Sequence, residues 1–596
     1  MLIIMSVVEQ IKKVTAKAIT QLYAVDIVEK DILVNATKPE FEGDYTVVLF
    51  AFVKQLKKSP DVLGNELGSY LKNKHAELFS SFNVIKGFLN LSITYNHWID
   101  FLQNQHTNIS YGVKEKNGER VMVEYSSPNT NKPLHLGHLR NNFLGWSIAE
   151  ILDATGYDVV KTCIVNDRGI HICKSMIAWQ LFANGATPES TNTKGDHFVG
   201  DYYVKFNDEY KKQIEKLKAT GLTQEGAEKQ APIMKATQQM LLDWEAGKPD
   251  VIALWNRMNS WVYAGFDATY KTIGSDFDKT YFESNTYLLG KSIVEKGLKK
   301  NVFFKKDDGS VWIDLTADGL DEKVVMRKDG TSVYITQDIG LAEQKQNEFN
   351  ANQSIYVVGD EQNYHFKVLK LICEKLGLAS ADQIYHLSYG MVELPTGKMK
   401  SREGTVVDAD DLVAEMINIS QQKTEELGKV KDFTGDELKE LYNTIGLGAL
   451  KFFLLRVDPK KKMVFNPEES IDFHGFTGPF IQYTHARIKS ILRKIGEVGS
   501  LKSGFESLFP LEKELIIQLE IFPSIIEEAA TDHDPSKLAI YIFNLAKTFN
   551  SFYSEHSITN AESEEKKQLR LQSAQLTASV IKKGMSLLGI KVPERM

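Results

Sequence analysis

The feature that most limits the fold is an alternation of short apolar runs with amphipathic stretches, which begins at Arg120. The β-type runs are RVMVEY (120–125), DVVKTCIV (158–165), SVWIDL (310–315), SVYIT (332–336) and QSIYVVGD (353–360). Stretches with helical periodicity alternate with them, for example at 139–156 and 363–378. This alternation predicts a parallel sheet covered by helices, a Rossmann-like α/β domain. A long, charged and mostly helical stretch at about 185–300 is interpreted as an insertion.

Two further regions flank this α/β region. The first 115 residues mix helical and β-type patterns and predict a small α+β domain, followed by a polar, glycine-bearing linker. After about residue 410 the β-type runs end and amphipathic helical segments dominate. We therefore expect a multidomain α/β protein with an N-terminal α+β domain (1–115), a Rossmann-like parallel-sheet domain with a helical insertion (116–410), a helical linking region (411–470) and an all-α domain (471–596).

Composition narrows the class of protein only slightly. The chain has 71 Lys and Arg against 78 Asp and Glu, a formal net charge of −7. This total neither supports nor excludes a nucleic-acid partner, because binding depends on local basic patches. No run of 18 or more apolar residues occurs, so we expect no membrane span. Cys163, Cys173 and Cys373 have no zinc or disulfide spacing and are interpreted as core residues of a cytoplasmic protein.

The segment SSPNTNKPLHLGHLRNNFLG (126–145) joins the first β-type run to a long helical stretch. Its Gly137 would let a ligand approach the backbone closely, and a helix N-terminus attracts anions. His135 and His138 share one face of that helix, and Lys132 adds a flexible positive charge. Together they favour polyphosphate binding, with donors directed at charge that develops during a transfer reaction. In isolation an H-x-x-H pair is more often structural, and a metal site here lacks a third ligand nearby.

Several segments resemble one known family. His135-Leu136-Gly137-His138 resembles the HIGH signature of class I aminoacyl-tRNA synthetases, and EYSSPNTNKPLHLGHLRN is similar to the form found in arginyl-tRNA synthetases. Further segments that resemble this family are VVMRKDGTSVYITQDIGLAEQK (324–345), YVVGDEQNYHFKVLK (356–370), QYTHARIKSI (482–491), FNLAKTFNSFYSEH (543–556) and SLLGIKVPERM (586–596). They occur in family order over nearly the whole chain, so a joint chance occurrence is very improbable.

The resemblance implies an arginine pocket. Tyr334 and Asp338 are four residues apart and face one side if their segment enters a helix. By resemblance they hold the guanidinium group, which suits a fixed carboxylate and a flat neighbour. Without their neighbours, Asp338 would be interpreted as a helix N-cap and Tyr334 as a core aromatic. The other arginine-binding positions that the resemblance implies are Glu124, Ser127, Asn129 and Gln362.

Class I synthetases carry a second, lysine-rich signature, KMSKS, for which GKMKSREGTVV (397–407) is the candidate. If Lys398 aligns with the first lysine, Lys400 replaces a serine and Ser401 replaces the second lysine. Members of the arginyl family often lack that lysine, and a lysine before the HIGH motif, here Lys132, is thought to substitute for it. Lys400 and Arg402 stay open as alternatives. The ATP-binding residues that the resemblance implies are His135, Gly137, His138, Lys398, Lys400 and Ser401.

The C-terminal helices resemble an anticodon-binding domain. The tRNA contacts implied there are Gln482, Tyr483, His485 and Arg487. Candidates by composition alone are Lys489, Arg493, Lys494, Lys582 and Lys583. The N-terminal region resembles more loosely the domain that arginyl enzymes place against the tRNA elbow. Its FEGDYTVV string would put an elbow contact at Asp44 or Tyr45.

The resemblance as a whole implies an ATP-dependent arginine–tRNA ligase with Lys132, His135 and His138 as catalytic residues. It implies L-arginine, ATP and tRNA(Arg) as substrates, Mg²⁺ with ATP, no zinc, and a monomer. Three alternatives stay open: a class I synthetase of another specificity, a smaller adenylyltransferase that shares the HIGH fold, and a non-catalytic tRNA-binding paralogue. The helical C-terminal domain argues against the second, and the intact histidines and Lys132 argue against the third.

Overall fold

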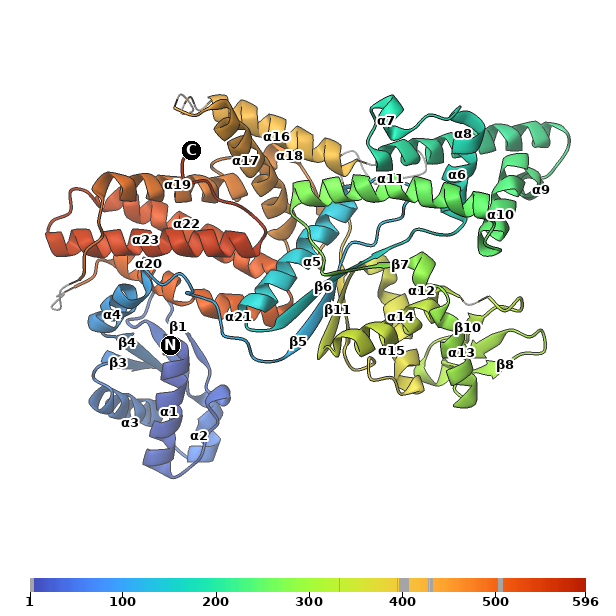
Figure 1. The fold of residues 1–596 in the computed structure, drawn as a ribbon. Helices are drawn as coiled ribbons and strands as arrows, with labels where there is room; N and C mark the ends of the chain where they lie inside the picture. Colours follow the sequence, from blue (N-terminus) through green and yellow to red (C-terminus); the bar gives the residue numbers. More distant parts are fainter. Residues whose placement is uncertain are drawn as a thin grey trace.

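The computed structural model describes residues 5–331, 333–393, 395, 407–426, 428, 432–501 and 507–596. At its centre is a parallel sheet with strand order β12-β11-β5-β6-β7 (Figure 1). The strands are β5 (Arg120–Glu124), β6 (Asp158–Val165), β7 (Lys279–Phe282), β11 (Gln353–Gly359) and β12 (Ile384–Tyr389). The predicted α/β class with a parallel sheet is confirmed.

The strand order reverses beside β5. From β5 the chain proceeds outward through β6 to β7 on one side, whereas β11 and then β12 lie on the other. β11 pairs directly with β5, with Ile355 opposite Val123. The loops that leave β5 and β11 therefore turn to opposite faces of the sheet and leave a crevice at its carboxyl edge. Open α/β sheets bind their ligands in such a crevice.

Helices cover both faces of this sheet. They are α5 (Leu136–Ala154) on one face, and α14 (Tyr334–Phe349) and α15 (Asn363–Leu376) on the other. Val121 and Val123 belong to the core that contains α5, whereas Met122 points into the core beneath α14 and α15. Helix α5 approaches the sheet closely because Gly145 has no side chain: a Cβ atom there would lie 2.3 Å from the Cβ of Tyr125.

A helical insertion leaves the sheet after β6 and returns at β7 (Figure 1). It consists of α6 (Ile170–Phe182), α7 (Pro188–Thr191), α8 (Gly195–Ala219), α9 (Gln224–Gln230), α10 (Pro232–Glu245) and α11 (Pro249–Ile273). Aromatic contacts hold its helices together, such as the Trp261 ring of α11 against Phe198 of α8, with centroids 5.6 Å apart. The stretch 279–282, inside the range predicted as insertion, is a strand of the central sheet.

Two of the predicted parallel strands are wrong. SVWIDL contributes β9 (Val311–Ile313) to a separate antiparallel sheet with β8 (Phe304–Lys305) and β10 (Lys323–Met326). Tyr334-Ile335-Thr336 opens helix α14 instead, and the Thr336 hydroxyl donates to the Val325 carbonyl at 2.6 Å. Short β-branched runs have no periodicity that distinguishes a strand from the first turn of a helix. Helices α12 (Glu283–Thr286) and α13 (Leu289–Lys299) connect β7 to this small sheet.

The N-terminal region is an α+β unit with an antiparallel sheet of order β1-β2-β4-β3. Its elements are α1 (Val7–Tyr23), β1 (Val34–Ala36), β2 (Tyr45–Val48), α2 (Phe50–Leu56), α3 (Pro60–Lys74), β3 (Phe79–Ile85), β4 (Phe88–Ile93) and α4 (Tyr95–Gln105). Ser6 caps α1 through a capping box with Glu9, and Ser59 caps α3 ahead of a proline. Helix α3 packs against β3 and β4, and α1 packs against α3, whereas α4 lies next to the C-terminal helices (Figure 1).

Among the described residues after β12, the regular elements are helices and the short parallel pair β13 (Val392–Glu393) and β14 (Met463–Val464). Its helices are α16 (Ala409–Glu426), α17 (Gly435–Leu455), α18 (Pro467–Ser470), α19 (Gly478–Ile495), α20 (Pro510–Glu520), α21 (Phe522–Asp532), α22 (Pro535–Glu555) and α23 (Glu564–Leu587). No helix in the described ranges is both long enough and apolar enough to cross a membrane.

The N-terminal unit docks on this helical bundle. Asp44 Oδ1 lies 2.6 Å from the Lys513 ammonium of α20, and Glu520 accepts the backbone N–H of Val7 at 2.7 Å. Tyr111 donates its hydroxyl to the Leu519 carbonyl at 2.9 Å. Asp44 is therefore engaged in this interface, and the side chain of Tyr45 is buried. In this conformation neither residue offers the free surface that an elbow contact with tRNA needs.

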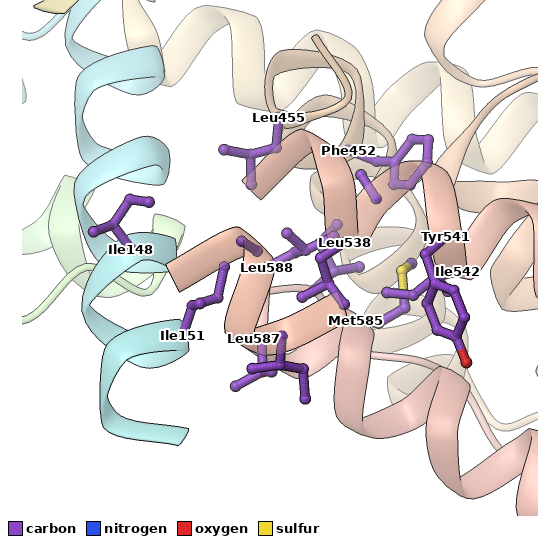
Figure 2. Packing of buried hydrophobic residues seen from close by; sticks show 14 of the residues in the cluster. Ile148, Ile151, Phe452, Leu455, Leu538, Tyr541, Ile542, Met585, Leu587 and Leu588 are labelled. Carbon is purple, nitrogen blue, oxygen red and sulfur yellow. The ribbon is translucent and has the colours of Figure 1, made fainter. Parts of the chain in front are cut away.

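Helix α5 also packs on the helical bundle. Figure 2 shows Ile148 and Ile151 of α5 facing Leu587 and Leu588 at the end of α23. The Ser147 hydroxyl donates to the Leu587 carbonyl at 2.9 Å across the same contact. The helix that follows β5 is thus shared by the parallel-sheet domain and the C-terminal bundle, so a shift of one is transmitted to the other.

A buried charge cluster stabilises the bundle and yields a testable prediction. Arg570 of α23 is fully buried and donates to Glu512 at 2.9 Å, to Glu562 at 2.7 Å and to the Ser557 carbonyl at 2.6 Å. Arg570→Ala leaves Glu512 buried with Lys566 as its remaining cation. We expect the free energy of unfolding to fall by about 1.5–3 kcal/mol, because the buried carboxylate loses one charged hydrogen-bond donor and keeps the other. Urea unfolding monitored by circular dichroism measures this loss.

Lys567→Ala on the same helix is the matched control. Its ammonium lies 3.5 Å from Glu564 at the surface, so we expect an unchanged unfolding midpoint. Equal midpoints for Arg570→Ala and the unaltered protein would contradict the assignment of a stabilising role to the buried cluster.

Candidate active site

The turn between β5 and α5 is held in a strained conformation. Ser126 has φ of +61°, in the left-handed region that a residue with a side chain rarely adopts. Its backbone N–H donates to Asn141 Oδ1 at 2.6 Å, and its hydroxyl lies 2.7 Å from the Tyr270 hydroxyl. Asn141 in turn donates to the Val357 carbonyl of β11 at 2.7 Å. Helix α5, strand β11 and helix α11 of the insertion therefore all fix the direction in which the chain leaves β5.

The two histidines stand at the N-terminus of α5. His135 is the N-cap residue, and its Nδ1 accepts the Gly137 N–H at 3.1 Å. The backbone N–H of His135 donates to His138 Nδ1 at 3.1 Å. Because Nδ1 of each ring is an acceptor, the proton of each neutral imidazole is on Nε2. The sequence predicted one shared face, and the ring centroids lie 3.9 Å apart.

Burial keeps both imidazoles neutral. It lowers the pKa of His135 to about 3, and the Lys132 charge adds to this effect. Burial, with the charges of His135 and Lys132, also holds the pKa of His138 well below its usual value. Burial lowers the pKa of the Lys132 ammonium as well. The site therefore offers two neutral N–H donors and one lysine to an incoming anion.

Lys132 and His135 border a cavity of about 210 Å³. The residues that line it are Lys132, Pro133, Leu134, His135, His197, Gly200, Asp201, Tyr203, Val204 and Asp408. One wall comes from the turn before α5, and the opposite wall comes from α8 of the insertion. Gly200 permits this approach, because a Cβ there would lie 2.8 Å from Pro133 Cδ. The insertion thus closes one side of the site that the sequence assigned to phosphate binding.

After the lysine-rich segment, the described part of the chain resumes beside this site. Lys398, Lys400, Ser401 and Arg402 themselves lie outside the described residues. Where the description resumes, Leu136 donates its N–H to the Val407 carbonyl at 3.2 Å, and Ala409 donates to the Leu134 carbonyl at 3.0 Å. The residues that follow the second signature are therefore paired with the backbone of the first.

Asp410 connects the chain after residue 407 to the helical insertion. Its carboxylate accepts from the Lys194 ammonium at 2.6 Å, from His197 Nε2 at 3.1 Å and from the Thr269 hydroxyl at 2.9 Å. These donors lower the pKa of Asp410 to about 2 against the opposing effect of burial. Within the described part of the chain, Asp196, His197 and Asp410 have the spacing of metal ligands. Lys194 lies between the two carboxylates and already supplies a positive charge there.

The predicted arginine pocket lies at the start of α14. The sequence predicted that Tyr334 and Asp338 share one side, and both are next to His365: its Nε2 lies 2.7 Å from Asp338 Oδ2, and its ring lies 5.6 Å from the Tyr334 ring. Burial raises the pKa of Asp338 despite the opposing effect of His365. The Asp338 charge, followed by burial, raises the pKa of the Tyr334 phenol. His365, which the sequence analysis did not single out, orients the predicted carboxylate.

Glu124 has a partner that sequence reasoning missed. Its carboxylate forms a buried ion pair with Lys345 of α14, and the Thr162 hydroxyl donates to it at 3.3 Å. The Lys345 ammonium lies 5.0 Å from the centre of the Tyr356 ring. One oxygen of Glu124 is therefore used by the protein itself. The signal for Lys345 was available in the sequence, since it is seven residues from Asp338 and lies on the same helical face.

Glu283 is a second residue that sequence reasoning missed. It is the first residue of α12, directly after β7. Burial raises its pKa to about 7; the Arg168 charge opposes this shift, and the charges of Asp167 and Asp338 reinforce it. Its charge also raises the pKa of Tyr334. Glu283 is therefore a second acidic group near Tyr334, beside Asp338. It reaches this position because the chain returns to the central sheet at β7, directly before Glu283.

The other predicted substrate residues lie at the carboxyl edge of the sheet. Asn129 pairs with Asn166 beyond the end of β6, and the Asn166 amide donates to the Ser127 carbonyl at 3.3 Å. Ser127 and Asn129 are exposed. Gln362 is also exposed and is the N-cap residue of α15, just past β11. Their side chains are accessible at the edge of the crevice between β5 and β11.

The predicted tRNA residues on α19 divide into two groups. Gln482 and His485 are buried, and they bind the C-terminal tail: Gln482 donates to the Lys591 carbonyl at 2.8 Å, and His485 Nδ1 lies 3.0 Å from the Pro593 carbonyl. Tyr483 and Arg487 are partly exposed, with the guanidinium 4.8 Å from the ring centre. In this conformation the accessible part of the predicted tRNA contact is therefore Tyr483 and Arg487.

Comparisons with known proteins agree with this architecture. Residues 101–466 match the family model of the class I tRNA synthetase (R) catalytic domain. Residues 481–596 match a DALR anticodon-binding domain, and residues 9–93 match an arginyl-tRNA synthetase N-terminal domain. The fold and the site thus define a class I aminoacyl-tRNA synthetase.

Individual relatives specify the family. The Arginine--tRNA ligase of Flavobacterium psychrophilum is 53% identical over 99% of this chain and 100% of its own, and that of Bacteroides fragilis is 51% identical over 96% and 97%. The Thermus thermophilus arginyl-tRNA synthetase structure has a TM-score of 0.80 at 25% identity, over 98% of this chain and 99% of its own. The chain belongs to the arginyl-tRNA synthetases, so the predicted family and the predicted enzyme class, an aminoacyl-tRNA ligase, are confirmed.

The Glu124–Lys345 pair generates a prediction. Lys345→Met removes the cation and leaves a buried carboxylate without its partner. We therefore expect the free energy of unfolding to fall by about 3–5 kcal/mol. The double variant with Glu124→Gln removes both charges and should recover most of this loss. Urea unfolding measures the difference between the two variants.

Lys296→Met is the control, because Lys296 forms a comparable pair with Glu343 of α14, at 2.7 Å, at the protein surface. The same unfolding midpoint for Lys345→Met and Lys296→Met would show that the Glu124 carboxylate does not depend on its buried partner.

Proposed function

We propose that this chain activates L-arginine with ATP and transfers the arginyl group to tRNA(Arg). A carboxylate oxygen of arginine attacks the α-phosphorus of ATP, and the bond to the β-phosphate oxygen breaks, giving arginyl-adenylate and pyrophosphate. The 2′-hydroxyl of the terminal adenosine then attacks the arginyl carbonyl and AMP leaves. The observation that supports the proposal is that the His135 and His138 donors follow strand β5, whose last residue, Glu124, lies close enough to Tyr334 and Asp338 for its charge to raise the pKa of both.

The two histidines act as hydrogen-bond donors. Their Nε2–H groups are set by backbone bonds to Nδ1, so they need no reorganisation when negative charge develops on the phosphates. Their lowered pKa values keep them neutral at pH 7, so they donate hydrogen bonds without adding positive charge. Lys132 supplies the mobile positive charge beside them. Mg²⁺ enters as part of the ATP complex, and we expect no zinc.

The opposite side of the crevice selects arginine. Asp338 and Glu283 supply negative charge near Tyr334, which suits a planar guanidinium with five donors. Glu124 lies at the end of β5, nearer the sheet, and Lys345 already binds one of its oxygens. We assign the guanidinium to Tyr334, Asp338 and Glu283, and the α-amino end of the substrate to the neighbourhood of Glu124, with Ser127, Asn129 and Gln362 at the edge.

The C-terminal bundle binds the anticodon region of tRNA, with Tyr483 and Arg487 as the contacts that are accessible on α19. An aromatic ring paired with a guanidinium suits an unstacked base and its phosphate. The enzyme acts as a monomer in the cytoplasm. By resemblance to the family, we expect arginine activation to require bound tRNA, and the contact of helix α5 with the bundle is a route by which tRNA bound there can affect the site.

Charging of total tRNA with each amino acid, with and without ATP, tests the proposal. We expect ATP-dependent charging with arginine alone. Charging with another amino acid would favour a synthetase of different specificity, and binding of tRNA without any charging would favour a non-catalytic paralogue. Robust arginine-dependent pyrophosphate exchange in the absence of tRNA would contradict the proposed tRNA requirement.

Lys132→Met tests the assignment of the phosphate-facing lysine. Removing one preorganised donor to a transition-state charge lowers kcat about 10²–10³-fold. We expect this loss in kcat with an unchanged Kd for tRNA, measured by aminoacylation kinetics and filter binding. Lys205→Met is the control: Lys205 lies on α8 and pairs with Glu209 at the surface, 3.2 Å away. An unaltered kcat for Lys132→Met would assign the role to Lys398, Lys400 or Arg402.

A further inference from the structure

A buried carboxylate lies behind the arginine pocket. Asp167 follows β6, which ends at Val165, and only 1% of its surface is exposed. A carboxylate so far from water needs hydrogen-bond donors on its oxygens. Those donors identify the elements that Asp167 connects, and they come from two places that are distant in sequence.

The first set of donors comes from α12. The Ser284 backbone N–H donates to Asp167 Oδ1 at 2.8 Å, and the Ser284 hydroxyl donates to Oδ2 at 2.7 Å. Two bonds from one residue to the two oxygens of one carboxylate fix both position and orientation. Ser284 directly follows Glu283, so this clamp fixes the backbone that carries the Glu283 carboxylate.

The second set of donors comes from α11 of the insertion. The Tyr263 hydroxyl donates to Asp167 Oδ2 at 2.9 Å. Trp255 Nε1 and the Asn259 amide donate to the Asp167 backbone carbonyl at 2.7 Å and 3.2 Å. One face of α11 therefore binds the side chain and the backbone of the same residue. Any displacement of α11 must be absorbed at Asp167 or passed to α12.

The neighbouring Arg168 does not take over this task. Its guanidinium binds Glu245 at 2.9 Å and lies 3.9 Å from the centre of the Tyr287 ring. Arg168 affects Glu283 only through its charge, which opposes the effect of burial on the pKa of the Glu283 carboxyl. The bonds to α12 and α11 run through Asp167.

We propose that Asp167 is the positioning residue for arginine recognition, holding Glu283 in place and coupling the insertion helix α11 to the arginine pocket. The inference rests on the proposed function, because it takes arginine as the ligand of that pocket. Asp167 does not touch the substrate itself; it acts through Ser284. The insertion lines the phosphate-facing cavity with α8 and supports the arginine pocket with α11, so one rigid unit sets both halves of the site.

Two conservative variants test the coupling at its two ends. Tyr263→Phe removes one hydroxyl on α11, and Ser284→Ala removes one hydroxyl on α12. Each loses a hydrogen bond to a charged group, and we expect each to weaken arginine binding about tenfold. The Kd for L-arginine is measured by calorimetry on the full-length chain, and the KM values for arginine and ATP and the Kd for tRNA are measured alongside. We expect the ATP and tRNA values to stay within about twofold.

Tyr541→Phe is the matched control. The Tyr541 phenol is buried in the C-terminal bundle and donates to the Gln518 carbonyl at 2.6 Å, so this variant loses the same group far from the pocket. We expect it to keep its arginine affinity. Equal weakening of arginine, ATP and tRNA binding in Tyr263→Phe would show a general loosening of the fold and overturn the proposal, as would an unchanged arginine affinity in both test variants.

A pH profile of Asp167→Asn tests the electrostatic contact between Asp167 and Glu283, and the comparison of arginine with ATP and tRNA binding controls for a general loosening of the fold. Burial, Asp167 and Asp338 raise the pKa of Glu283 to about 7, and Arg168 opposes them. Glu283 must be ionised to bind a guanidinium, so kcat/KM for arginine falls as the pH decreases through this pKa. Removing the Asp167 charge lowers the pKa, and the acidic limb of the profile shifts to lower pH. A limb that stays in place, or shifts to higher pH, overturns the proposal.

The failure of the proposed function is distinguishable from the failure of this inference. If the unaltered protein binds arginine but does not charge tRNA, the proposed function fails, and the calorimetric comparison still decides the role of Asp167. If the unaltered protein binds no arginine, both fail. If it charges arginine and the variants bind arginine normally, only the inference fails.

Discussion

The structure depends most on how the N-terminus of helix α5 is held. Backbone N–H groups donate to Nδ1 of His135 and His138, and this sets both the ring positions and the tautomers. The strained turn at Ser126 delivers the chain to that position, and Asn141 ties the turn back to β11. Helix α5 then passes Gly145 against the sheet and reaches the C-terminal bundle, so it places the donors relative to both.

The site separates two kinds of charge across one crevice. In the proposed function, Lys132 and the neutral imidazoles face the phosphates of ATP, whereas Asp338 and Glu283 face the guanidinium group of arginine. The protein supplies partners to only part of the acidic set: Lys345 binds Glu124, and His365 binds Asp338. Because buried carboxylates without partners are costly, the pocket is best stabilised when a cationic substrate completes it. The geometry thus links substrate binding to the stability of the pocket.

The helical insertion contributes to the candidate active site through two of its helices. Its helix α8 borders the phosphate-facing cavity, and Asp410 binds Lys194 and Thr269 of the insertion just where the chain returns from the lysine-rich segment. Its helix α11 holds Asp167 behind the arginine pocket. The insertion therefore lines the proposed phosphate side directly and supports the proposed arginine pocket indirectly, through Asp167.

The sequence by itself determined the α/β class, the helical C-terminal region, the family, and the residues within local motifs, such as His135, His138, Tyr334 and Asp338. These follow from periodicity and from short strings, which depend only on neighbours in the chain. It did not distinguish the start of α14 from a strand, because a short β-branched run suits both. Only the tertiary structure decided which charged groups meet in the site: Lys345 pairs with Glu124, and Glu283 lies near Asp338. It also decided that Asp167 binds α11 and α12. In the bundle, it decided that Gln482 and His485 bind the C-terminal tail. Those contacts join segments far apart in the chain, and their partners are set by packing and burial, which no local pattern of residues encodes.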